Sequence, residues 1–217
     1  MEQKIVAFDF DGTLTTRDTL LLFVRHACGQ AAFVGALIVF TPLLMLMKLR
    51  LIDNGKTKER FFGHFFRGWT LERFDAVCRD FADKNRHLLR PEMMKTLQQA
   101  QANGAQVFVV SASIENWVQP FFSPARASLF PSQGGMANPS PLEESEGTVT
   151  VIGTQIEVRD GVLTGRFTTP NCYGPEKVRR LGALLPQREN YHITAYGDSR
   201  GDRELLAWAD KGIKVKG

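Results

Sequence analysis

Short apolar runs that alternate with helical stretches constrain the fold of this chain more than any other feature of its 217 residues. The runs at residues 4–10, 106–110, 191–195 and 212–215 have the length and composition of buried strands. The stretches between them carry helix signals, such as the proline that opens a helical pattern at Pro91. Strands and helices that alternate at this spacing predict an α/β fold with a Rossmann-like parallel sheet sandwiched by helices.

Residues 18–90 interrupt this alternation. They contain no convincing strand, and apolar residues such as Leu71 and Phe74 recur at helical spacing. We predict that residues 18–90 form an all-helical cap domain, inserted between the two parts of the α/β core at 1–17 and 91–217.

Two segments of the predicted core have their own patterns. Residues 155–167 alternate around Asp160-Gly161, which is a strong signal for a β-hairpin. Residues 123–147 are rich in proline, serine, glycine and asparagine, which predicts a flexible loop with little structure of its own.

An apolar run at residues 31–47 contains no charged residue. As a helix it would be roughly 26 Å long, just short of a hydrocarbon core of about 30 Å, and Pro42 would kink it. A single crossing would also separate Asp9 from Asp198, which the motifs below assign to one site. We therefore predict a helix within the cap that covers the site with one face, and peripheral membrane contact through 31–47 stays an alternative.

Charge and cysteine content limit the partners and the compartment. The net charge of +4 favours anionic partners, but no long run of Lys or Arg is present, so nucleic acid is not expected. Phosphorylated metabolites and anionic lipid headgroups fit equally well. Three cysteines without metal-ligand spacing, and no apolar segment of signal-peptide type before Asp9, predict a cytoplasmic location, with the inner membrane surface as an alternative. The oligomeric state is not predicted.

The first chemical motif is Asp9-Phe10-Asp11-Gly12-Thr13, at the end of the first predicted strand. Alternation along an extended chain points the carboxylates of Asp9 and Asp11 the same way. Ligands of open α/β sheets bind outside the carboxyl ends of the strands, where this pair is expected. Gly12 permits the turn, and Thr13 can donate a hydrogen bond to a phosphoryl oxygen.

Three further elements follow predicted strands or open helices. Ser111 follows the second strand, Lys177 lies early in the helix after Gly174-Pro175, and Asp198 and Asp202 lie on a glycine-containing loop after the third strand. Taken singly, Ser111 also fits a helix cap or turn, and Lys177 also fits a solvated helix position. Their common placement at strand ends and helix starts favours one shared site.

With these four motifs the chain resembles the haloacid-dehalogenase (HAD) superfamily phosphatases. The branch it resembles is the phosphoserine-phosphatase-like one, subfamily IB, which has a helical C1 cap between the first two motifs. The resemblance implies a phosphatase that hydrolyses a phosphomonoester through an aspartyl-phosphate on Asp9, with Asp11 as general acid and base. It further implies that Ser111 binds the phosphoryl group and that Lys177 neutralises charge.

The resemblance also implies a cofactor and a set of contacts to a small phosphorylated substrate. The cofactor is Mg²⁺, a hard cation that suits carboxylate oxygens. Its ligands would be Asp9, the carbonyl of Asp11, and Asp198, with Asp202 in support. The substrate contacts would be Thr13, Ser111, Ala112, Lys177 and Asp18, the last at the position where phosphoserine phosphatase has a glutamate that contacts the substrate amine.

The substrate itself is not predicted. The chain has Ala112-Ser113 where phosphoserine phosphatase has a glycine pair. It also resembles bacterial phosphatidylglycerophosphatases, in its apolar run and in the spacing of Gly174-Pro175-Glu176-Lys177. Two alternatives therefore stand beside a phosphatase for a soluble phosphomonoester. One is a membrane-surface phospholipid phosphatase, and the other is a non-hydrolytic phospho-acceptor signalling domain.

Overall fold

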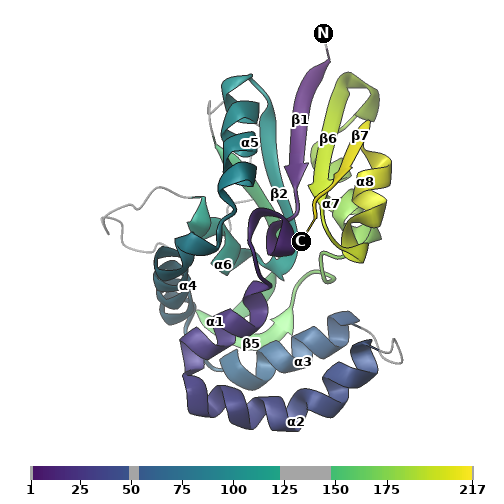
Figure 1. Cartoon of the computed structure of the whole chain (residues 1–217). Helices are drawn as coiled ribbons and strands as arrows, with labels where there is room; N and C mark the ends of the chain where they lie inside the picture. Colours follow the sequence, from purple (N-terminus) through teal and green to yellow (C-terminus); the bar gives the residue numbers. More distant parts are fainter. Residues whose placement is uncertain (1, 49–53, 123–147, 217) are drawn as a thin grey trace.

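A five-stranded parallel sheet forms the centre of the core, and a helical cap lies beyond the carboxyl ends of its strands (Figure 1). The computed structural model describes residues 2–48, 54–122 and 148–216. The strand order is β3-β2-β1-β6-β7, and every pairing is parallel, which confirms the predicted Rossmann-like sheet. The strands are β1 (Gln3–Phe8), β2 (Gln106–Ile114), β3 (Val149–Thr154), β6 (Tyr191–Gly197) and β7 (Lys211–Lys214). Strand β3 was not predicted, and the predicted loop at 123–147 lies outside the described residues.

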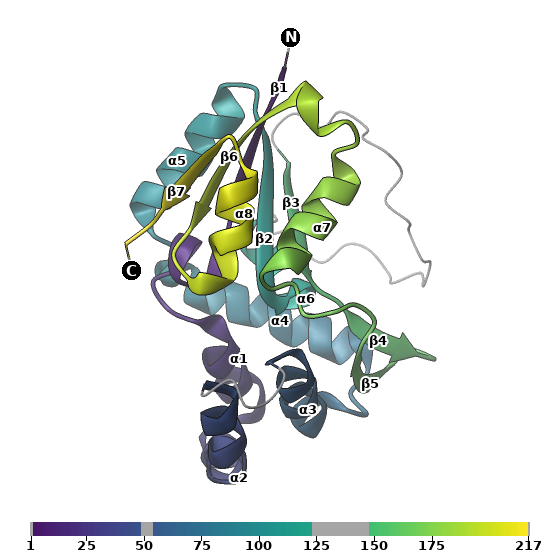
Figure 2. The same ribbon diagram turned by 90° about the vertical axis from the view of Figure 1, so that its right-hand side faces the viewer.

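Side chains of β1 and β2 alternate between two hydrophobic clusters, one on each face of the sheet. One face packs against α5 (Pro91–Ala102), and the other packs against α7 (Pro175–Leu184) and α8 (Arg203–Trp208), as Figure 2 shows. Both faces are therefore apolar, which is why these strands read as continuous apolar runs.

The described part of the cap contains the helices α1 (Thr19–Cys28), α2 (Gln30–Lys48), α3 (Asn54–Phe66) and α4 (Leu71–Asn85). Phe23 of α1 packs with Phe66 of α3 and with Phe74 and Phe81 of α4, and it stacks on Trp117 with ring centroids 4.6 Å apart. Trp117 belongs to α6 (Glu115–Val118), directly after β2. This aromatic cluster therefore joins the cap to the core. The remaining single turns are η1 (Phe10–Leu14), η2 (Arg86–Leu88), η3 (Gln119–Phe121), η4 (Arg188–Asn190) and η5 (Arg200–Asp202).

The predicted hairpin is confirmed as β4 (Ile156–Arg159) and β5 (Val162–Phe167), with positive φ angles of 50° at Asp160 and 74° at Gly161. It lies beside the cap helix α3 (Figure 2). Two glycines permit this approach, because a Cβ added to Gly63 would lie 2.8 Å from the carbonyl oxygen of Gly165.

The apolar run forms most of α2, which continues through Pro42 as one helix. Among the described residues, no helix is long and apolar enough to cross a membrane. The prediction that this segment covers the site is wrong. Helices α1 and α3 lie between α2 and the sheet (Figures 1 and 2), because the apolar residues of α1 and α3 pack toward the core and leave α2 on the outer side.

Candidate active site

The loop after β1 brings the first motif to the carboxyl end of the sheet. Asp9 is the first residue after the strand and is only 5% exposed. Gly12 has a φ of +82°, and a Cβ at this position would lie 2.4 Å from Oδ2 of Asp198. Glycine is thus required here both by the backbone conformation and by the close approach of the Asp198 carboxylate.

Lys177 connects two buried carboxylates. Its Nζ donates to Oδ1 of Asp9 at 2.5 Å and to Oδ1 of Asp202 at 2.6 Å, and all three side chains are buried. Burial raises the pKa of Asp9 to about 7, although Lys177 acts in the opposite direction. Burial by itself would lower the pKa of Lys177, but the two carboxylates raise it above its ordinary value, so this lysine stays charged.

The loop after β6 supplies the other carboxylates. Asp202 accepts hydrogen bonds at Oδ2 from the backbone N–H of Ser199 at 2.9 Å and from its hydroxyl at 2.7 Å. Asp198 accepts at Oδ1 from the Thr13 hydroxyl at 3.2 Å, and burial raises the pKa of Asp198. These bonds fix both side chains on the side of the loop that faces Asp9.

The three carboxylates fit a metal ion. One oxygen each from Asp9, Asp198 and Asp202 lies within 4.8 Å of the others. Hard oxygen donors with room left for water and phosphate oxygens are the environment that Mg²⁺ prefers. The Asp11 carboxylate is not part of this group, and a ligand role for the Asp11 backbone carbonyl stays a prediction.

Asp11 is held by a separate network. Its Oδ1 accepts from the backbone N–H of Thr19 at 2.8 Å and from the Thr19 hydroxyl at 2.6 Å, and its Oδ2 accepts from the Ser113 hydroxyl at 2.5 Å. The indole N–H of Trp117 donates to the Thr19 hydroxyl at 3.3 Å. Burial raises the pKa of Asp11, and the nearby Asp18 adds to this effect. The carboxyl is thus oriented from the cap and from the end of β2 together.

The end of β2 forms another wall of the site. Ser111 is buried, and its Oγ accepts from the backbone N–H of Ser113 at 3.0 Å. The carbonyl of Ala112 accepts from the Thr154 hydroxyl at 2.8 Å and from Nζ of Lys58 at 2.7 Å. Lys58 belongs to the cap helix α3, so the cap contributes a lysine to this part of the site. Burial lowers the pKa of Lys58, whereas Asp11 and Asp18 act to raise it.

Most predicted site residues meet at this edge of the sheet, and Asp18 lies near enough to raise the pKa of Asp11 and of Lys58. It is exposed and caps α1, where its Oδ1 accepts from the backbone N–H of Leu20 at 2.9 Å. A contact between Asp18 and substrate stays a prediction.

Sequence reasoning missed three residues of the site, which are Thr19, Ser113 and Lys58. A usable signal for Ser113 was its spacing of two residues from Ser111, which in an extended chain places two side chains on the same side. The sequence carries no comparable signal for Lys58, which lies on a helix 54 positions before Ala112.

Comparison with known sequences gives two likenesses. The family model described as haloacid dehalogenase-like hydrolase matches residues 6–126 and 140–207. The chain is also 32% identical over 218 residues to Protein CicA of Caulobacter vibrioides, in a match that covers 99% of this chain and 87% of CicA.

Two solved structures are similar in fold. A HAD-family hydrolase from Salmonella enterica serovar Typhi matches with a TM-score of 0.64 and 22% identity over 97% of this chain, which spans 62% of the Salmonella chain. Phosphoserine phosphatase in its apo form matches with a TM-score of 0.60 and 17% identity, over 99% of this chain and 86% of the other. The predicted resemblance to the phosphoserine-phosphatase-like branch is therefore confirmed in the fold.

Proposed function

We propose that this chain, which belongs to the haloacid dehalogenase-like hydrolase family, is a Mg²⁺-dependent phosphatase that hydrolyses a phosphomonoester through an aspartyl-phosphate on Asp9. The observation that carries the proposal is the buried group of Asp9, Lys177 and Asp202, next to Asp198. A buried carboxylate beside a fixed cation and a candidate metal site is suited to attack on an anionic phosphoryl group. When bound by Asp9, Asp198 and Asp202, Mg²⁺ would offset the repulsion between nucleophile and substrate.

Asp9 and Asp11 have different roles in the proposed reaction. The Asp9 carboxylate attacks phosphorus while the bond from phosphorus to the leaving oxygen breaks, and Asp11 gives that oxygen its proton. Asp11 then takes a proton from water as the water oxygen attacks phosphorus, which releases phosphate and restores Asp9. The raised pKa of Asp11 supports the acid role, because the carboxyl must be protonated before the first step.

The surrounding groups support an anionic substrate. The Ser111 hydroxyl, the backbone N–H of Ala112 and Lys177 are expected to contact the phosphoryl group. The Thr13 hydroxyl is a further expected contact, and without substrate it donates to Asp198. Lys58 adds a second lysine on the cap side, where the alcohol part of a substrate would lie. Membership of a hydrolase family favours turnover over the phospho-acceptor alternative, which would instead keep a long-lived aspartyl-phosphate.

The first test of this function is metal-dependent hydrolysis. The purified protein is expected to release p-nitrophenol from p-nitrophenyl phosphate with Mg²⁺, and to lose that activity in excess chelator and regain it when Mg²⁺ is added back. Unchanged activity in chelator would contradict the proposal.

The affinity for Mg²⁺ is expected to depend on pH. Without metal, Asp9 has a pKa of about 7, so below pH 7 it carries a proton that a cation must displace. The apparent association constant should therefore fall by roughly tenfold for each pH unit below 7 and level off above it. Calorimetric titration with Mg²⁺ at several pH values measures this slope, and a flat profile between pH 5.5 and 8 would contradict binding to a carboxyl with a raised pKa.

Ser113→Ala is expected to impair the acid step. The substitution removes one of three hydrogen bonds that orient the Asp11 carboxyl, and kcat for an alkyl phosphate should fall by about tenfold. The effect on p-nitrophenyl phosphate should be smaller, because its leaving group needs little protonation. Equal losses on the two substrates would indicate a general structural role for Ser113.

A further inference from the structure

The outer face of α2 is apolar and exposed. Val34, Ile38 and Val39 are 44%, 73% and 68% exposed, respectively. Val34 and Ile38 are one helical turn apart and therefore lie on the same side of the helix. Single exposed aliphatic residues are ordinary, but a group of them within the charge-free run at 31–47 favours an interaction surface.

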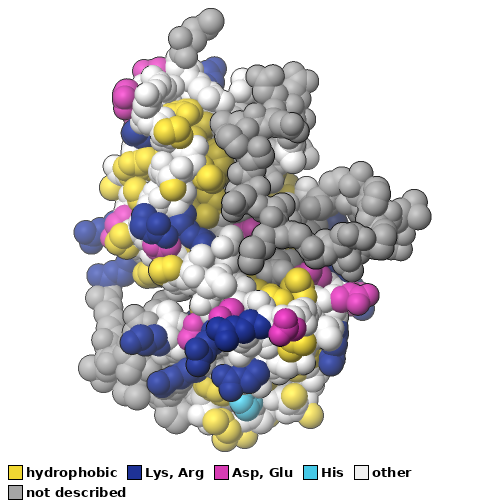
Figure 3. All heavy atoms as spheres, turned by 180° about the vertical axis from the view of Figure 1, so that it is seen from behind, with side chains coloured by type: hydrophobic (Ala, Val, Ile, Leu, Met, Phe, Trp, Pro, Cys, Tyr) yellow, Lys and Arg dark blue, Asp and Glu magenta, His cyan; other side chains and the backbone are white. Residues whose placement is uncertain are grey.

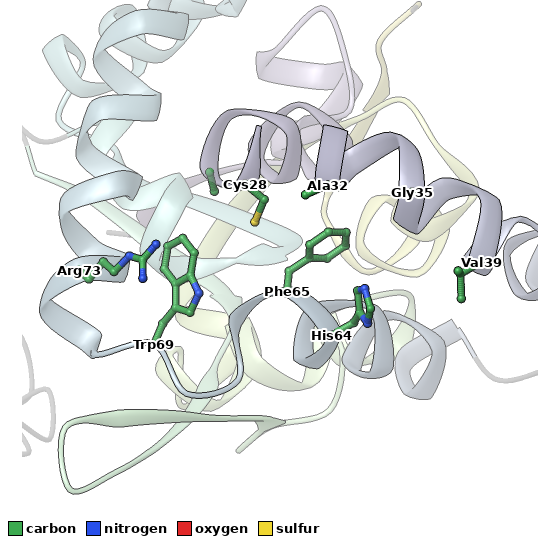
Figure 4. A pocket seen from close by; sticks show the side chains of 9 residues that line it. Cys28, Ala32, Gly35, Val39, His64, Phe65, Trp69 and Arg73 are labelled. Carbon is green, nitrogen blue, oxygen red and sulfur yellow. The ribbon is translucent and has the colours of Figure 1, made fainter. Parts of the chain in front are cut away.

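A groove of about 570 Å³ lies next to this face (Figure 4). Ala32, Gly35 and Val39 line one side, and Phe65 and Trp69 line the other. The Arg73 guanidinium lies at one end, 3.7 Å from the centroid of the Trp69 ring. None of the lining residues belongs to the site that holds Asp9, so the groove is a separate feature of the cap.

Basic side chains border the apolar surface. A second groove shares His64 with the first and is lined by Arg60, Arg67 and Arg166, all of which are exposed. The carboxylate in that groove, Glu59, accepts a hydrogen bond from the backbone N–H of Phe167 at 2.9 Å. Figure 3 shows Lys and Arg side chains gathered in a band across the cap, with a few Asp and Glu side chains beside them and hydrophobic side chains toward the outer end of the cap.

We propose that the outer face of the cap, defined by Val34, Ile38 and Val39 with the bordering arginines, docks on an anionic lipid bilayer. An apolar helix face that lies in the membrane plane, with cations at the level of the headgroups, is the arrangement that peripheral membrane helices use. The charge favours lipid over a second copy of this chain, because pairing two such faces would bring arginines together. The surface is separate from the site, so this inference does not depend on the proposed function.

The test is flotation of the full-length protein with vesicles. It is expected to bind vesicles made of equal parts phosphatidylcholine and phosphatidylglycerol, and to bind pure phosphatidylcholine much more weakly. Ile38→Glu combined with Val39→Glu should weaken binding by at least about tenfold, because two aliphatic side chains no longer enter the bilayer. Arg60→Glu should weaken binding to the anionic vesicles by about fivefold or more, and added salt should weaken the wild type.

Leu184→Glu is the matched control, since Leu184 is 39% exposed on α7 in the core and should not affect binding. Light scattering of the same proteins tests the alternative that a second copy of this chain covers the face. A wild-type dimer that Ile38→Glu with Val39→Glu dissociates would identify the face as a self-association surface and overturn the proposal. Absence of wild-type binding to either vesicle would also overturn it. Hydrolysis of p-nitrophenyl phosphate should be equal in all variants, and its absence throughout would count against the proposed function alone.

Discussion

Asp9→Asn is expected to lower turnover with Mg²⁺ by at least about 10⁴-fold and to abolish covalent phosphorylation. The amide has nearly the shape of the carboxylate, and its oxygen can still accept from Nζ of Lys177 at the position that Oδ1 occupies now. The fold should therefore remain, while the nucleophilic charge is lost. Acid quenching after mixing with substrate, followed by mass spectrometry of peptides, measures the phosphoenzyme directly.

Asp11→Asn is the comparison for this variant. It leaves the nucleophile intact, so p-nitrophenyl phosphate should still phosphorylate Asp9, while release of phosphate should be slow because no base activates water. Wild-type rates in Asp9→Asn, or phosphate attached to another residue in the quenched wild type, would refute the assignment of the nucleophile.

Lys177→Met is expected to destabilise the metal-free protein by about 3–5 kcal/mol at pH 8, since it leaves the carboxylates of Asp9 and Asp202 buried without their cation. Loss of the lysine removes the group that lowers the pKa of Asp9, so in the folded variant this pKa rises further above its unfolded value of 3.8. Well below pH 7 Asp9 carries a proton in both folded proteins, so its share of the destabilisation should be small at pH 5.5 and should grow as pH rises above about 7, where the wild type holds the charged carboxylate beside Lys177 and the variant does not.

Urea denaturation in chelator at the two pH values measures this difference, because bound Mg²⁺ would itself neutralise the carboxylates. Lys95→Met is the control, since Lys95 is exposed on α5 and its loss should change stability by less than about 0.5 kcal/mol at either pH. An equal and small effect for both variants would mean that Lys177 does not compensate the buried charges.

Most residues of the candidate site could be predicted from the sequence, because their positions follow from strands and turns that local sequence patterns specify. Strands buried on both faces must be apolar throughout, so β1, β2 and β6 were recognisable, and side chains that follow parallel strands meet at one edge of the sheet. This placed Asp9, Ser111 and Asp198 close together before the structure was known. The hairpin at Asp160-Gly161 was predictable for a similar reason, since its turn is specified by two adjacent residues.

The tertiary structure decided the features that depend on which surfaces pack together. The location of the apolar run at 31–47 could not be predicted, because composition does not distinguish a helix above the site from one on the outer side of the cap. The orientation of Asp11 depends on Thr19 and on Ser113, which is 102 positions away in sequence. Lys58 of α3 reaches the carbonyl of Ala112 across 54 positions in the sequence. Such contacts are fixed by the docking of the cap on the sheet, and no local pattern in the sequence encodes that docking.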